Sequence, residues 1–403
     1  MNTTADKLQG ILDSKAAIKS AIEAKGVTVG DAALSQYASK IQAISTGMTE
    51  AEENDVNFYD YDGFRVASFT IAQAKALTAE QYAAILPPTH DGLTFQEWNW
   101  SLNDIQTYDR QYADIGANYI TTDGKTHLSV RVDAGENLYL YFIKDNTITA
   151  TLDWGDNSAQ ESISHNEKKN HVYANAGTYD VTISATGTGK WGFNGSYIFP
   201  MNVIKIHLGN FSSLPSGKPY CNVSVPNTAY CSVTYVGGTM LVIPRNVSLD
   251  SQNFVYQSYA NICFPKKVNS YPSVRLLFYI TGTRIVLPDT VQNNPILAST
   301  VNSCQYISIL SLPNQQLDPS NTNGNFFNGN TNIEYIDIVQ GWTPNKDLLL
   351  SGSTRWRQET LVKFFNKLGT TQNTITLTFG STNLNKLTAD QKAIATDKGY
   401  TLA

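Results

Sequence analysis

The stretch that decides the fold lies between residues 241 and 288, where LVIP (241–244), ICFP (262–265) and IVLP (285–288) repeat one pattern. Related units stand at 223–226 (VSVP) and 309–313 (ILSLP), and the prolines at 226, 244, 265, 288 and 313 are 18, 21, 23 and 25 residues apart. Each unit indicates a short strand, because its proline cannot continue a hydrogen-bonded ladder. One strand every 18–25 residues predicts a solenoid of stacked parallel strands.

Three units carry an apolar residue three positions after the proline, and we expect these side chains, Val247, Val268 and Val291, to turn back into the solenoid core. The unit resembles the BspA-type leucine-rich repeat of bacterial surface proteins and phages, in which L-x-x-I-x-I-P recurs. The resemblance implies a leucine-rich-repeat solenoid over residues 201–403.

The chain beyond Pro313 continues the strand pattern without proline, at residues 333–338 and 375–379. An amphipathic helix is predicted over 355–368, and a last helix is predicted to begin at Thr388, where Thr-Ala-Asp-Gln forms a capping box. Because a solenoid needs terminal caps, we expect these helices to supply one.

The N-terminal 46 residues favour two amphipathic helices, one over 5–25 and one from Asp31. Isolated helices of this length are marginal, so their apolar stripes need partners, either each other or further copies. We therefore predict an anchor that forms oligomers over residues 1–46 and a polar linker over 47–55. The stripe residues are Leu8, Ile11, Leu12, Ile18, Ile22, Leu34, Tyr37, Ile41 and Ile44.

Residues 7–44, KLQGILDSKAAIKSAIEAKGVTVGDAALSQYASKIQAI, resemble a module at the start of fibre and other structural proteins of gut-bacterium phages. The resemblance implies a virion fibre or appendage protein that docks to other virion proteins through its N-terminus. It also implies a homo-oligomer, for which a trimer is expected.

Residues 56–124 predict a small α+β domain. An Asp62-Gly63 turn joins two alternating runs over 56–69, which predicts a β-hairpin. An alternative interpretation of Asp60-x-Asp62-Gly63 is a phosphoryl-transfer motif similar to that of haloacid-dehalogenase-like enzymes. Helices are predicted over 71–86 and 98–112.

Residues 125–200 predict an immunoglobulin-like β-sandwich, with strands at 127–132, 138–143, 148–154 and 179–183. Asp153-Trp154-Gly155-Asp156, His171-Val172-Tyr173 and Gly177-Thr178-Tyr179 with Val181 resemble the PKD domain. Asn157 replaces a glycine of that pattern, but asparagine tolerates the left-handed turn conformation. Turn capping is the expected role of Asp153 and Asp156, and Ca²⁺ binding by the pair stays open.

Composition excludes several classes of function. Lys+Arg 29 against Asp+Glu 34 gives a net charge of −5, so the chain has no basic footprint for nucleic acid or an anionic membrane. It has no apolar run long enough for a transmembrane helix and no apolar N-terminal signal region. The four cysteines, at spacings that match no zinc pattern, are expected to be free and buried.

No phosphate-binding loop, HExxH or G-x-S-x-G motif is present, and the five histidines are scattered. We therefore expect no catalysis, no cofactor and no metal. The aromatic clusters at 98–100, 191–193 and 256–259 are expected to be core anchors rather than carbohydrate-stacking platforms.

The sequence thus predicts a mainly β, multidomain protein and a non-enzymatic function. The leading hypothesis is a phage head or tail fibre on the virion surface that adheres to bacterial glycan or protein. The alternatives are a bacterial cell-surface leucine-rich-repeat adhesin and a capsule depolymerase.

Overall fold

The computed structural model describes residues 55–189, 191–193, 202–210, 223–224, 240–245, 261–268, 277–278, 284–291, 301–302, 306–316, 327 and 329–403, together with residues 9, 12, 14–16 and 18–20. By their contacts the residues form two compact units, Met1–Asn54 and Asp55–Ala403. The described fold is mainly β and built from several sheets, as the sequence predicts.

The first sheet, which we call the small sheet, has the strand order β2-β1-β4-β3. Strands β1 (Val56–Tyr59) and β2 (Arg65–Phe69) form the predicted antiparallel hairpin, and the φ of Gly63 in its turn is 95°. Strand β4 (Ala113–Thr121) pairs in parallel with β1, and β3 (Leu93–Trp98) pairs antiparallel with β4.

Three short helices accompany the small sheet: α3 (Ile71–Lys75), α4 (Ala79–Ala83) and α5 (Leu102–Gln106). The prediction of one helix over 71–86 is wrong, because Thr78 starts a second helix with its own capping box. The prediction of a helix over 98–112 is wrong for most of its length. Trp98 still belongs to β3, and α5 begins only after the Ser101 cap.

The next two sheets share one apolar core. A five-stranded sheet has the order β12 (Val203–His207), β5 (Thr126–Val132), β10 (Gly177–Gly187), β7 (Ile148–Asp153), β8 (Glu161–Ile163). A three-stranded sheet has the order β11 (Trp191–Phe193), β6 (Asn137–Lys144), β9 (Glu167–Val172). All neighbours pair antiparallel, and side chains along β5 and β6 alternate between buried and more exposed.

The four strands predicted in this region are confirmed, while β8, β9, β11 and β12 were not predicted. Trp154 is buried, and its carbonyl accepts a hydrogen bond from the Tyr173 hydroxyl at 2.9 Å. Asn157 adopts the expected left-handed conformation, with φ 67°.

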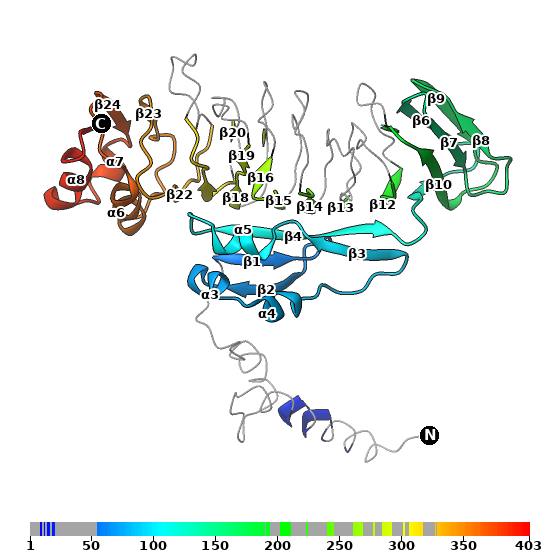
Figure 1. Cartoon of the computed structure of the whole chain (residues 1–403), viewed down its shortest axis with the longest axis horizontal. Helices are drawn as coiled ribbons and strands as arrows, with labels where there is room; N and C mark the ends of the chain where they lie inside the picture. The colour runs from blue at the N-terminus through cyan, green and yellow to red at the C-terminus, as the bar shows by residue number, and fades with distance from the viewer. Residues whose placement is uncertain are drawn as a thin grey trace. The chain divides into compact units, whose positions relative to one another are not determined.

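The C-terminal half contains short strands that pair in parallel. We give the name strand row to β13 (Val223–Ser224), β14 (Met240–Val242), β15 (Asn261–Cys263), β18 (Arg284–Val286), β21 (Ile309–Ser311) and β22 (Tyr335–Asp337). They form two parallel ladders, β13-β14-β15 and β18-β21-β22. Each coincides with one predicted repeat unit. Figure 1 shows the strands side by side, with the small sheet lying along them.

Three further parallel ladders accompany the strand row. They pair β16 (Lys267–Val268) with β19 (Asp289–Thr290), β17 (Leu277–Phe278) with β20 (Val301–Asn302), and β23 (Leu348–Leu349), β24 (Ile375–Thr378) and β25 (Tyr400–Leu402) with one another.

The two faces of the strand row belong to different cores. Register places Leu241 beside Ile262 and Ile285 beside Leu310, and all four lie in the large core that the row shares with the two antiparallel sheets. Val268 is buried as predicted, but the prediction for Val291 is wrong, since this side chain is 70% exposed just after β19. Val247 lies outside the described residues.

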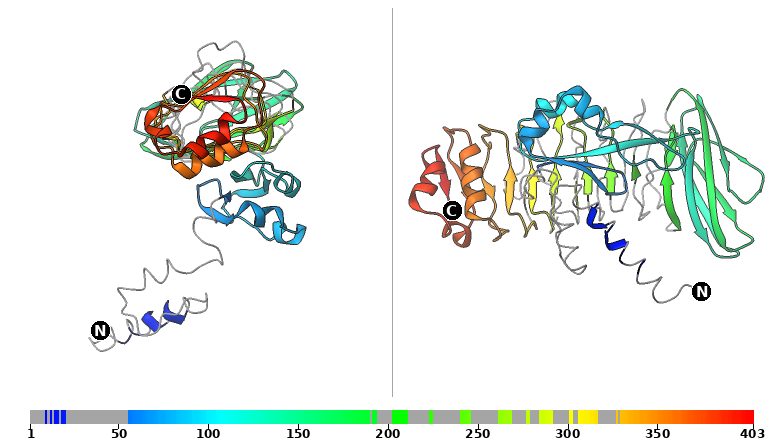
Figure 2. Two further views of the ribbon diagram at one scale, coloured as in Figure 1. Left: turned by 90° about the vertical axis from the view of Figure 1, so that its left-hand side faces the viewer. Right: turned by 90° about the horizontal axis from the view of Figure 1, so that it is seen from below.

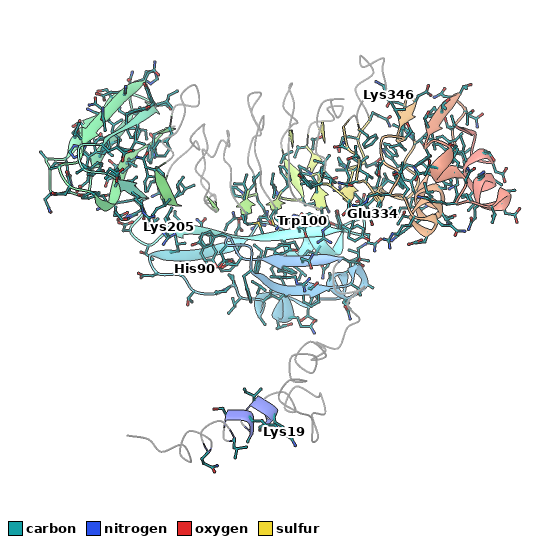
Figure 3. All side chains as sticks on the ribbon, turned by 180° about the vertical axis from the view of Figure 1, so that it is seen from behind. Lys19, His90, Trp100, Lys205, Glu334 and Lys346 are labelled. Carbon is teal, nitrogen blue, oxygen red and sulfur yellow. The ribbon has the colours of Figure 1, made fainter. Side chains whose placement is uncertain are left out.

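The opposite face of the strand row is covered by the small sheet, and we call it the covered face. A Cβ on Gly116 of β4 would stand 2.5 Å from Val242, so only glycine allows this close approach. Asn99 donates to the carbonyls of Ile243 and Cys263, both at 2.9 Å, and the Trp100 indole donates to the Phe264 carbonyl at 2.8 Å. Figure 3 shows Trp100 where the small sheet meets the row.

Helices α6 (Gln358–Lys367), α7 (Ser381–Leu384) and α8 (Ala389–Thr396) lie at the C-terminal end of the strands, as the orange and red end of the chain in Figure 2 shows. Helix α6 contacts β22 and α8, and α8 contacts β25 of the last parallel ladder. The predicted capping box at Thr388 is confirmed, with Gln391 as its partner. Helix α6 matches the predicted 355–368 helix. Among the described residues, no helix combines the length and apolarity needed to cross a membrane.

Candidate functional site

A polar pocket of about 320 Å³ lies beside the five-stranded sheet, and we call it the histidine pocket. The loop before β3 and the loop after β4 form one side of it, and strands β5, β10 and β12 form the other. Its lining residues are Asp91, Gly92, Thr122, Asp123, His127, Ser129, Asp180, Lys205 and His207.

Strand register explains why these side chains meet. Ser129 on β5 pairs with Asp180 on β10 and with Lys205 on β12. Because directly paired residues project from the same side of a sheet, this trio forms one row. His127 pairs with His207, two residues along the same strands, and adds the next row.

His127 lies between two carboxylates. Its Nδ1 is 2.8 Å from Asp180 Oδ2, and its Nε2 is 3.2 Å from both oxygens of Asp123. Carboxylates only accept hydrogen bonds, so both contacts form together when both ring nitrogens carry a proton. Burial opposes ionisation of Asp123, but hydrogen bonds from the Lys125 backbone N–H and from His127 outweigh it, and the pKa of Asp123 falls below 3.8.

His207 supplies a neutral imidazole. Burial, reinforced by the charges of Lys205 and His127, lowers the pKa of His207 to about 4. Its Nε2 lies 3.4 Å from the hydroxyl of Tyr61, whose own pKa is raised by burial. The neutral phenol and the neutral imidazole therefore share one hydrogen bond, whose direction depends on which ring nitrogen of His207 carries the proton.

A second layer of polar groups lies behind the pocket. The carboxylate of Asp60 is fully buried and lies 2.6 Å from Nε2 of His90, the neighbour of the lining residue Asp91. Burial raises the pKa of Asp60 above 3.8, against hydrogen bonds from Tyr119 and His90. The His90 ring packs edge-on against Tyr61 at 4.8 Å. In Figure 3 both His90 and Lys205 are labelled near the junction of the small sheet with β12.

The pocket contains negatively charged hydrogen-bond acceptors together with several kinds of hydrogen-bond donor. Its carboxylates come from Asp91, Asp123 and Asp180, and its donors come from Lys205, the two histidines and two hydroxyls. The carboxylates of Asp123 and Asp180 contact opposite nitrogens of His127, so the imidazole separates them. In the described part of the chain, no group of three or more His, Cys, Asp or Glu residues has a metal-binding arrangement.

The sequence analysis missed this pocket. Its signal was present, since His127 and Ser129, and likewise Lys205 and His207, are polar residues two positions apart within strands. Two-residue spacing places each pair on one sheet face, but only the pairing register brings the two strands together.

Two of the nine predicted anchor residues are described. Leu12 and Ile18 are helical and exposed, at 51% and 41%. The other seven, Leu8, Ile11, Ile22, Leu34, Tyr37, Ile41 and Ile44, lie outside the described residues.

Other residues singled out in the sequence have structural contacts. Asp153 accepts from the Gly155 N–H and Asp156 accepts from the Ser158 N–H, which are turn-capping contacts. Asp156 also lies 2.6 Å from Nε2 of His171. The clusters at 98–100 and 191–193 are buried core, as expected. The cluster at 256–259 lies outside the described residues. Cys263 is free and buried, and the other three cysteines are not described.

A second pocket, of about 500 Å³, lies against α6 and α8. Its two lysines already have partners, since Lys363 contacts Gln111 and Lys367 pairs with Asp337 at 2.6 Å. The histidine pocket gathers three carboxylates, two histidines and one lysine from five segments of the chain, and it is therefore the stronger candidate site.

Comparison of the chain with protein-family models, with curated proteins and with solved structures finds no match.

Proposed function

We propose that the chain is a non-enzymatic structural protein of a phage virion, a head or tail fibre that docks through its N-terminus and presents Asp55–Ala403 for adhesion to the bacterial surface. The observation that carries the proposal is the division of the chain into a unit that ends at Asn54 and a compact β-rich unit that begins at Asp55. This division falls within the linker predicted over 47–55. An attachment segment followed by a presenting unit is the organisation that a fibre needs.

The proposal includes finer assignments for the presenting unit. The strand row, with one parallel strand per repeat unit, supports a leucine-rich-repeat solenoid over 201–403, capped by α6 and α8. The two antiparallel sheets with a common core support a PKD-like sandwich over 125–200. The small sheet and its helices represent the α+β domain over 56–124.

We further propose that the N-terminal segment forms a homo-oligomer, with a trimer preferred, and contacts other virion proteins. Exposed Leu12 and Ile18 on a helical stretch are consistent with such contacts. Neither nucleic acid nor membrane is a proposed partner, since the net charge is −5.

Particle labelling tests the docking function. Gold-labelled full chain should decorate particles in electron micrographs, and a variant that lacks residues 1–46 should be a soluble monomer that leaves particles bare. If the truncated chain still assembles onto particles, docking lies in Asp55–Ala403 and the proposal is wrong.

Adhesion is tested with the whole presenting unit. A fragment that begins near Ile204 would cut β12 out of its pairing with β5, so the fragment should begin at Asp55. It should bind host cells without releasing sugar fragments. Release of oligosaccharide would instead support the depolymerase, and labelled protein found on bacteria rather than on particles would support the adhesin.

A further inference from the structure

We propose that the histidine pocket is a saccharide-binding site that takes one or two rings of a neutral sugar. The inference deepens the proposed adhesion function and rests on it, because it names the ligand class and places its site on the five-stranded sheet.

The size of the pocket suits such a ligand. Its volume of about 320 Å³ stands at the lower end of the roughly 300–1,000 Å³ typical of small-molecule sites. Strand pairing fixes the row of Ser129, Asp180 and Lys205, so the polar groups are held by the backbone ladder. A site on paired strands needs little reorganisation to bind.

The alternation of acceptors and donors matches sugar hydroxyls. Across the first row the carboxylate of Asp180 accepts, the hydroxyl of Ser129 can do either, and the ammonium of Lys205 donates. In the next row His207 offers an imidazole ring that can donate or accept at one nitrogen, while its Nε2 contacts the hydroxyl of Tyr61. Each hydroxyl of a sugar both donates and accepts, so neighbouring hydroxyls can bridge these groups.

Charge selects a neutral rather than an acidic sugar. Three carboxylates line the pocket, and they face one ammonium, Lys205, and one histidine, His127, that carboxylates hold on both sides. An added carboxylate or phosphate would meet this acidic lining. Hydrogen bonds to charged partners are the strong ones, so loss of Asp180 or Lys205 should weaken binding most.

The experiment uses the full chain on a glycan array with neutral, amino-bearing and acidic saccharides, followed by calorimetry with the best neutral sugar. We expect neutral sugars to bind, and we expect Asp180→Ala and Lys205→Ala each to weaken binding about 10- to 100-fold. Ser129→Ala, which removes one hydroxyl in the same row, should weaken binding less. Melting curves check that each variant is folded.

The matched control is Lys168→Ala on β9. The ammonium of this exposed lysine lies 4.6 Å from the ring centroid of Tyr139 and 5.5 Å from that of Tyr141. The substitution therefore removes a cation from the three-stranded sheet, away from the histidine pocket. It should bind sugar as the unchanged chain does.

Several results would overturn the proposal: an array without any bound sugar, binding confined to acidic sugars, pocket variants that bind normally, or loss of binding in Lys168→Ala alone. Other outcomes distinguish a failure of the pocket assignment from a failure of the proposed adhesion function. If pocket variants bind host cells as well as the unchanged chain does, adhesion stands and the pocket assignment falls. If the chain binds neutral sugars but neither particles nor host cells, the pocket assignment stands and the proposed function falls.

Discussion

The two ends of the covered face are held by different chemistry. Over β14 and β15, Met240, Val242 and Cys263 form an apolar cluster with Tyr59 and Tyr61 of the small sheet. The close approach of β4 at Gly116 completes this end. Here the small sheet and the strand row pack largely as two apolar layers, and their polar contacts are hydrogen bonds from uncharged side chains, Asn99 and Trp100, to backbone carbonyls.

The other end, over β18, β21 and β22, is closed by buried charge. Arg284 binds Asp114 through Nε at 2.9 Å and through a second contact from Nη2. Asp337 is fully buried and accepts from the backbone N–H of Gln111 at 2.8 Å and from Lys367 at 2.6 Å. An ion pair tolerates only its own geometry, whereas apolar layers can repack. The polar end therefore fixes the position of the small sheet, and the apolar end contributes packing.

Breaking the ion pair should have the largest effect. Arg284→Met leaves the carboxylate of Asp114 buried without its cation, and we expect the free energy of unfolding to fall by about 3–5 kcal/mol. Denaturant unfolding of the full chain measures the loss. The double variant Arg284→Met with Asp114→Leu removes both charges and should recover most of it. A single variant that costs under about 1 kcal/mol would contradict the contrast between the two ends.

The inward face of the strand row gives the next effect. Ile285 and Leu287 are fully buried in the large core, and we expect Ile285→Ala or Leu287→Ala to cost about 2–5 kcal/mol through lost burial and a cavity. Val286→Ala, on the covered face between them, should cost about 1.5 kcal/mol at about 0.8 kcal/mol per methylene. Losses near zero for Ile285 and Leu287 would refute the inward orientation.

Gly116→Ala sharpens the comparison at the apolar end. The new methyl group would meet Val242 and Cys263 at under 3.0 Å, and we expect a loss of about 1–3 kcal/mol from overpacking. Val242→Ala in the same chain makes room for the methyl group. A double-mutant cycle should therefore show that the two changes cost less together than separately, and additive losses would mean that the layers are not in contact there.

The last effect depends on pH and arises at the edge of the apolar end, where Tyr61 contacts His207. The folded-state pKa of His207, about 4, lies below its ordinary value of 6.5, so the unfolded chain takes up this proton first as pH falls. The contribution of neutral His207 to the free energy of unfolding is fully present above pH 6.5 and is lost as the pH falls from 6.5 to about 4. His207→Asn should reduce the drop in melting temperature over that interval. An equal drop in both proteins would contradict the assignment.

The sequence predicts the inward face of the strand row better than the covered face. Leu241 and Ile285 recur with the proline period, so the repeat identifies them. Val242 and Cys263 lie between inward residues and make each unit apolar on both sides, a pattern that indicates a strand buried on both faces. This pattern indicates that some segment packs on the outer face of the strands, but it does not indicate which segment. The Asp114–Arg284 pair joins residues 170 positions apart, and no local pattern encodes such a distance.

The direct entry of the chain from Asp55 into β1 has a mechanical consequence. β1 lies in parallel register with β4, and β4 ends at Thr121, next to the pocket residues Thr122 and Asp123. A tether ahead of Asp55 and a ligand in the pocket would pull the start of β1 and the end of β4 in opposite directions along one axis. All hydrogen bonds of the ladder would then bear the force at once, in shear, rather than break one after another from one end. Under tension the small sheet would thus behave as a shear coupling, and its resistance would be set by the rate of forced unfolding rather than by equilibrium stability.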